Sequence, residues 1–202
     1  MKEIKIEWTG IRPLLMHSAA MVDPENEYVL EKTRLNKEVK KAKGNLEEQN
    51  KLRRESDRAS WLGSVYWDSE AGFYMPGQNI FRCIIEAARK EKLGKQAEMA
   101  IIPIEDVNPI KTIDYPKGEP EKAYAMPEFS LRGPVRVPPK TGARVIAVRP
   151  IIPTGWKVTF TIEWDESLLS KDELVKANTT AGALIGIGTW RPRFGRFTIR
   201  VL

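Results

Sequence analysis

The chain has 202 residues, of which 42% are hydrophobic and 30% are charged, and its net charge is +6 at pH 7. This length and balance exclude an intrinsically disordered chain and are typical of a folded, soluble protein with a sizeable core. No apolar run of about 18 residues occurs that would cross a bilayer, and the N-terminus is charged where a signal peptide is apolar, so we expect a cytoplasmic protein with no membrane partner. The single cysteine, Cys83, excludes an internal disulfide framework.

Basic residues are concentrated in two stretches of the chain. Residues 131–162 contain six basic side chains and no acidic one, and residues 185–202 contain four and no acidic one. The two stretches together carry +10, so the remainder of the chain carries −4. Such asymmetry is typical of a face that contacts phosphates. A solvated face on an ordinary basic protein is the alternative interpretation.

The first predicted element is a strand at residues 3–9, where apolar and polar side chains alternate. Residues 23–60 differ in character, because they are rich in Lys, Arg, Glu and Asn and poor in apolar side chains. We predict a helical insertion there, interrupted near Gly44, that buries little of itself. Residues 61–67 and 72–75 form two short apolar runs that predict a β-hairpin.

Apolar side chains at helical spacing predict a helix over residues 79–92. Many prolines and glycines in residues 94–140 predict a long loop insertion. A capping-box sequence at Ser170–Glu173 predicts the start of a second helix. The remaining predicted elements are strands at 144–149 and 156–163, this second helix over 171–184, and a last strand at 196–202.

The order strand, helix, strand, strand, helix, strand predicts an α+β fold with a ferredoxin-like (RRM-like) βαββαβ core. In this interpretation residues 1–202 form a single domain. The helical insertion at 23–60 and the loop insertion at 94–140 are additions to it.

The C-terminal stretch, residues 182–202, contains four glycines and four arginines. Gly186 and Gly188 lie where an apolar helix ends, and glycine there permits positive φ and lets another backbone or a phosphate come close. Arginine offers a planar fork of donors that matches phosphate and stacks on bases. We therefore predict a nucleic-acid-binding surface. A helix cap, a turn and a final core strand are the alternative for the glycines.

The layout resembles a known family. A ferredoxin-like core, the sequence Pro-Leu-Leu-Met-His at Pro13–His17, a helical insertion and a glycine- and arginine-rich loop at Gly182–Phe197 are similar to the CRISPR-associated RAMP proteins. The resemblance is to their backbone subunit, which lines up along a guide RNA. This chain is shorter than is usual for that family, and Trp190–Arg193 departs from the usual glycine spacing.

The resemblance implies partners and a binding site. The partners are single-stranded guide RNA, copies of the chain in a filament-like assembly, and other effector subunits, while the insertion at 23–60 is thumb-like and reaches a neighbouring subunit. The basic run from Arg132 to Arg149 would border the same groove as the C-terminal loop. The implied nucleic-acid-binding residues are Arg132, Arg136, Lys140, Arg144, Arg149, Gly186, Gly188, Arg191, Arg193 and Arg196.

Catalysis has little support in the sequence. His17 is the only histidine, which excludes a Cys/His metal cluster and a two-histidine ribonuclease centre, and we predict no metal and no cofactor. Asp23 occupies a place similar to that of an acidic residue that supports RNA cleavage in some relatives. We expect a non-enzymatic protein. The alternatives are an endoribonuclease of the same superfamily that uses Asp23 or His17, and a structural or interaction protein, for example of phage origin, whose basic face binds a protein partner.

Overall fold

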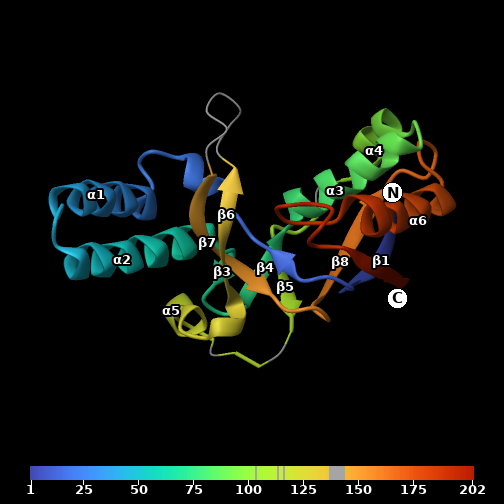
Figure 1. Ribbon diagram of the computed structural model, residues 1–202. Coiled ribbons are helices and arrows are strands. Elements are labelled where there is room, and N and C mark those ends of the chain that lie inside the picture. Colours follow the sequence, from blue (N-terminus) through green and yellow to red (C-terminus); the bar gives the residue numbers. More distant parts are fainter. Residues whose placement is uncertain (103, 113, 116, 137–143) are drawn as a thin grey trace. The chain divides into compact units, whose positions relative to one another are not determined.

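The computed structural model describes residues 1–102, 104–112, 114–115, 117–136 and 144–202. The fold is α+β, as predicted, and the chain divides into two compact units (Figure 1). The first unit is formed by Met1–Leu15, Tyr66–Gly118 and Ile152–Leu202, and the second by Met16–Val65 and Glu119–Ile151. Among the described residues, no helix has both the length and the apolar character that crossing a membrane requires.

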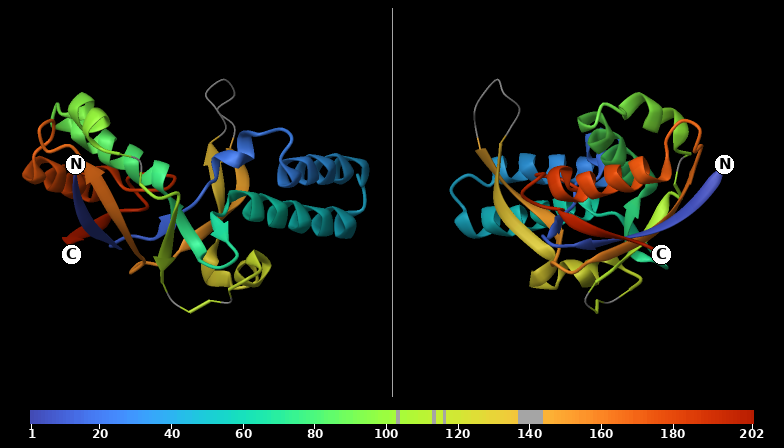
Figure 2. Two further views of the ribbon diagram at one scale, coloured as in Figure 1. Left: turned by 180° about the vertical axis from the view of Figure 1, so that it is seen from behind. Right: turned by 90° about the vertical axis from the view of Figure 1, so that its right-hand side faces the viewer.

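The first unit is built on a sheet with the strand order β3-β4-β5-β8-β1-β9. Two further short elements belong to it, β2 (Leu14–Leu15) and helix α4 (Gly94–Ala100). The strands of the sheet are β1 (Lys2–Gly10), β3 (Trp67–Asp68), β4 (Gly72–Pro76), β5 (Val107–Lys111), β8 (Lys157–Trp164) and β9 (Phe197–Val201). The two main helices, α3 (Gly77–Lys90) and α6 (Lys171–Thr180), lie on one face of this sheet (Figure 2).

Strand β1 lies between β8 and the edge strand β9 in this sheet, and is antiparallel to both. Its apolar side chains Ile4, Ile6 and Trp8 are buried, which confirms the predicted alternation. Trp8 stacks on Phe197 of β9 with 4.0 Å between ring centroids. Its Nε1–H donates to Oδ1 of Asn178 on α6 at 3.1 Å, so one side chain joins the sheet to the helix that covers it.

The predicted helices and strands at 79–92, 156–163, 171–184 and 196–202 are confirmed as α3, β8, α6 and β9, and α6 begins with the predicted capping box. The second core strand was placed wrongly. Residues 144–149 belong to β7 (Arg144–Ile152), which is not part of this sheet, and β5 lies beside β8 instead. The signal for β5 is poor because Pro109, which has no N–H to donate, lies at its centre.

The second unit contains a helical hairpin and a two-stranded antiparallel ladder. Helices α1 (Glu27–Lys41) and α2 (Leu46–Ser64) lie side by side and confirm the helical character predicted for 23–60, with the turn at Gly44 (Figure 1). The other elements are α5 (Pro120–Tyr124), β6 (Ser130–Arg136), β7, and 3-10 turns at Ala19–Val22 and Pro127–Phe129. Residues of β6 and β7 pair from Ser130 with Pro150 to Arg136 with Arg144.

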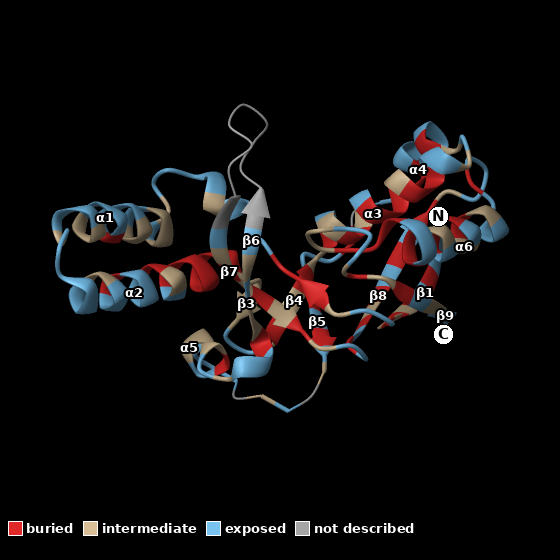
Figure 3. Cartoon of the chain, in the orientation of Figure 1, coloured by how far each residue is buried: buried red, intermediate tan, exposed pale blue. Residues whose placement is uncertain are grey.

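Two further predictions are wrong in this region. Residues 61–64, predicted as a strand, are the last turn of α2, where Trp61 is fully buried and donates its Nε1–H to the Phe129 carbonyl at 2.9 Å. Figure 3 shows that burial is concentrated at this end of α2, whereas the rest of the hairpin is largely exposed. The range 94–140, predicted as a loop insertion, contains α4, β5, α5 and β6.

Candidate nucleic-acid interface

The loop between α6 and β9 is fixed by backbone hydrogen bonds. Helix α6 continues into a π-helical turn, Ala181–Ile185, which ends at Gly186 with φ of 76°. The Thr189 N–H then donates to the Leu15 carbonyl at 2.8 Å, and the Gly195 N–H donates to the Pro13 carbonyl at 2.8 Å. The loop is therefore held against the segment that follows β1, and the side chains that it carries are positioned by a rigid backbone.

The glycines of this loop allow close packing of the chain on itself. Gly186 is buried, and Gly188 has φ of 86°. A Cβ atom on Gly188 would overlap with the Leu15 carbonyl, and one on Gly195 would overlap with the Ile187 carbonyl. The close approach that the sequence predicts at Gly186 and Gly188 thus occurs with the chain's own backbone. Their contact with phosphate remains a prediction.

A hollow of about 650 Å³ lies along the outer side of this loop, and we call it the arginine groove. Its lining residues come from the loop and from the end of β1: Arg12, Pro13, Pro192, Arg193, Phe194 and Arg196. The Arg193 guanidinium lies 5.7 Å from the centre of the Phe194 ring. The Arg196 Nε atom is buried and has no hydrogen-bond partner within the described part of the chain.

The charges of the arginine groove are not neutralised. Within the described ranges, none of Arg12, Arg193 and Arg196 has a carboxylate within ion-pair distance. The backbone beneath them is rigid, because the Arg12 carbonyl accepts from Trp156 Nε1 at 2.9 Å and the Arg196 carbonyl accepts from the Ile11 N–H at 2.9 Å. Three permanent cations therefore line one hollow together with a partly exposed aromatic ring, and one of them, Arg193, lies over that ring.

Arg191 lies in the same loop but is used differently. Its Nη1 donates to Oε2 of Glu86 on α3 at 3.0 Å and to the Gly186 carbonyl at 3.4 Å. This pairing compensates its charge and ties the loop to α3. Of the three loop arginines predicted to bind nucleic acid, the structure thus brings Arg193 and Arg196 to the groove and directs Arg191 away from it. Arg12, which the sequence analysis omitted, takes the third place.

The other predicted binding residues lie in the second unit. Arg132 on β6 is paired with Asp57 on α2, and Arg149 on β7 is partly buried. The backbones of Arg136 and Arg144 are register partners at one end of the ladder. Lys140 lies outside the described residues.

No protein-family model matches the sequence, and no curated protein is significantly similar to it. The chemistry of the chain's own residues must therefore indicate what it binds. In the first unit, that chemistry is a cluster of unneutralised arginines beside a phenylalanine ring.

The two catalytic candidates have structural partners. Asp23 Oδ1 accepts the Glu25 N–H at 2.9 Å, and His17 Nδ1 lies 3.1 Å from Ser64 Oγ. Burial, together with the charges of Arg149 and Lys32, lowers the pKa of His17 to about 4, so the ring is neutral at pH 7. Among the described residues, no three His, Cys, Asp or Glu side chains are grouped closely enough to hold a metal ion.

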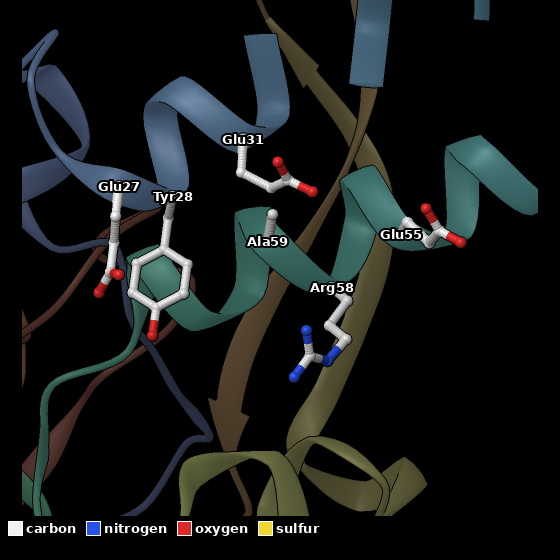
Figure 4. Close-up of a pocket in the computed structure, with 6 residues that line it drawn as sticks. All are labelled: Glu27, Tyr28, Glu31, Glu55, Arg58 and Ala59. Atoms are coloured by element: carbon white, nitrogen blue, oxygen red, sulfur yellow. The ribbon is translucent and has the colours of Figure 1, made fainter. Parts of the chain in front are cut away.

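A smaller hollow of about 290 Å³ lies between α1 and α2, lined by Glu27, Tyr28, Glu31, Glu55, Arg58 and Ala59 (Figure 4). Two of its charged groups are engaged with neighbours. Arg34 binds Glu31 at 2.7 Å, and Arg58 extends toward α5, where it binds Glu121 at 2.9 Å. The lining of this hollow is mostly acidic, with one paired arginine, whereas the arginine groove is lined by three arginines that have no ion-pair partner among the described residues.

Proposed function

We propose that this chain is an RNA-binding backbone subunit that assembles side by side along a single-stranded guide RNA in a CRISPR-type effector complex. The observation that carries the proposal is the arginine groove, which Arg12, Arg193 and Arg196 line together with Phe194, and in which none of the three has an ion-pair partner among the described residues. Phosphates supply the missing negative charge, and an aromatic ring beside the guanidinium groups offers a surface on which a base can stack.

The topology of the first unit supports the same proposal. Its elements follow the order β1, α3, β5, β8, α6, β9, and the four strands lie side by side as β5-β8-β1-β9. We infer from this order a ferredoxin-like core, with α3 and α6 as its two helices. The hairpin of α1 and α2 follows the first strand, and the arginine-rich loop precedes the last. This is the layout on which the resemblance to RAMP backbone subunits rests.

The chemistry of the groove suits a protein that covers RNA of any sequence. Guanidinium groups bind phosphate oxygens, which are the same at every nucleotide, and stacking on a phenylalanine ring tolerates any base. Reading a sequence instead requires hydrogen bonds to base edges. We therefore propose binding that depends strongly on salt and only slightly on sequence, with other copies of the chain and other effector subunits as protein partners.

The first test is the state in which the protein is purified without nuclease. We expect a high ratio of absorbance at 260 nm to that at 280 nm, and a particle in light scattering that is much larger than the 23.0 kDa chain and that nuclease reduces in size. A monomer with a protein-like absorbance ratio, which also fails to bind a fluorescent single-stranded RNA at low salt, would contradict the proposal.

A further inference from the structure

The second unit holds His17 in a fixed position between α2 and β7. The Met16 N–H donates to the Pro150 carbonyl at 2.9 Å, and the Ser18 N–H donates to the Ser64 carbonyl at 3.0 Å. These two bonds hold the backbone on both sides of His17, and the His17 ring adds a contact to Ser64 Oγ at 3.1 Å. The His17 residue keeps partial exposure to solvent, although burial of its ring is the main cause of its lowered pKa.

Two basic side chains, Lys32 and Arg149, lie close enough to this histidine to lower its pKa. Lys32 on α1 donates from Nζ to Oγ of Ser60 at 3.2 Å, and the Ser60 hydroxyl is itself buried in α2. Arg149 on β7 has buried Nε and Nη1 atoms, and neither finds a hydrogen-bond partner in the described part of the chain. Guanidinium donors removed from water without an acceptor are unfavourable. We call these three side chains the His17–Lys32–Arg149 cluster.

The positive charges of Lys32 and Arg149 repel each other. Burial is the larger cause of the lowered pKa of both Lys32 and His17. The nearby charge of Arg149 lowers both pKa values further. Asp57 acts on Lys32 in the opposite direction, but its carboxylate is paired with Arg132. Partly buried like charges are stable together only when an anion or water compensates them.

We propose that the His17–Lys32–Arg149 cluster binds a phosphoryl group. Arg149 offers guanidinium donors that suit phosphate oxygens, Lys32 offers a point charge, and the Ser60 hydroxyl can donate while it accepts from Lys32. The ligand is a phosphate of an RNA backbone or a free phosphoryl compound. The proposal uses residues of the second unit alone, and it stands whether or not the arginine groove binds RNA.

The test uses inorganic phosphate as the probe, with the full chain and no nucleic acid. Thermal melts are recorded against phosphate concentration at constant ionic strength, with chloride as the balancing anion. We expect phosphate to raise the Tm of the wild type along a saturating curve. The rise is lost in Arg149→Met and in Lys32→Met, and it persists in Lys37→Met, which removes the same charge from an exposed position of the same helix. Circular dichroism checks that each variant is folded.

Two results would overturn the proposal. One is a wild type that phosphate stabilises no more than chloride does, and the other is an equal rise in Tm in all three variants. If Arg149→Met does not fold, Lys32→Met decides alone, because Lys32 lies on a partly exposed helix face. A fluorescent single-stranded RNA then identifies the source of the phosphate. Competition between it and phosphate assigns the site to the RNA backbone, and independent binding assigns it to a free phosphoryl compound.

Discussion

Replacing Arg12, Arg193 and Arg196 together by Gln tests the arginine groove. Glutamine removes each positive charge but retains a polar side chain. The main-chain bonds that fix the loop, from Ile11 to the Arg196 carbonyl and from Gly195 to the Pro13 carbonyl, do not depend on these side chains. We therefore expect a folded variant that has lost the three cations without an ion-pair partner among the described residues.

The expected effect follows from the number of phosphates that the groove contacts. For a single strand each neutralised phosphate contributes about −0.7 to the slope of log K against log salt, so three contacts contribute about −2. Between about 50 and about 200 mM salt this slope corresponds to a loss of roughly 20-fold in affinity. The variant should lack this part of the salt dependence. At low salt it should bind at least about tenfold more weakly, which is about 1.4 kcal/mol.

The assay is fluorescence anisotropy with a single-stranded RNA of mixed sequence at several salt concentrations. A matched control replaces three exposed lysines of the same unit, Lys92, Lys95 and Lys171, by Gln, so the net charge changes equally. The control should keep the wild-type slope to within one unit. A folded groove variant with unchanged affinity and slope, or a control that loses as much as the groove variant, would refute the assignment of the RNA site to these arginines.

Three further predictions concern stability. Gly195→Ala should lower the Tm more than Gly155→Ala does. Both positions have positive φ, which costs a residue with a Cβ about 1–2 kcal/mol. Only at Gly195 would the added Cβ also overlap with backbone atoms. Equal melting temperatures would contradict this reasoning. Asn178→Leu should lower the free energy of unfolding by about 1–3 kcal/mol in urea melts, because it leaves Trp8 Nε1 buried without an acceptor. The free energy of unfolding should also decrease as the pH falls from 6.5 to about 4. In this range His17 takes up a proton in the unfolded chain, whereas in the folded chain it stays neutral. In His17→Gln this part of the pH dependence should be absent.

The sequence predicted the central elements of the first unit well because their side-chain patterns are periodic. The alternation in β1 and β8 and the apolar stripe of α3 are strong signals, and each element forms where the pattern lies. The sequence pattern does not predict the short strand β5, because Pro109 interrupts it, and it wrongly predicts a strand at the end of α2, because Trp61 and its neighbours are apolar. An apolar run of a few residues does not separate a buried helix turn from a buried strand.

The candidate site was predicted in part for a related reason. The composition of the C-terminal loop identified Arg193 and Arg196, and the structure brings both to one groove. It did not identify Arg12, which joins them because Gly10 pairs with Phe197 in the sheet. Nor did it indicate that Arg191 is paired with Glu86 on α3. Composition shows how many cations a segment carries, but not which of them find a carboxylate elsewhere in the chain.

The sequence by itself determined the fold class, the central strands and helices, the helical hairpin and the concentration of arginine near the C-terminus. Local periodicity, capping and charge depend on residues that are close together in the sequence, and their effects extend over only a few residues. Only the tertiary structure decided which strands share a sheet, which arginines lack a partner among the described residues, and that Lys32 and Arg149 both act on His17. Those outcomes depend on contacts between residues far apart in the chain. These contacts are determined by tertiary packing and not by local conformational preference.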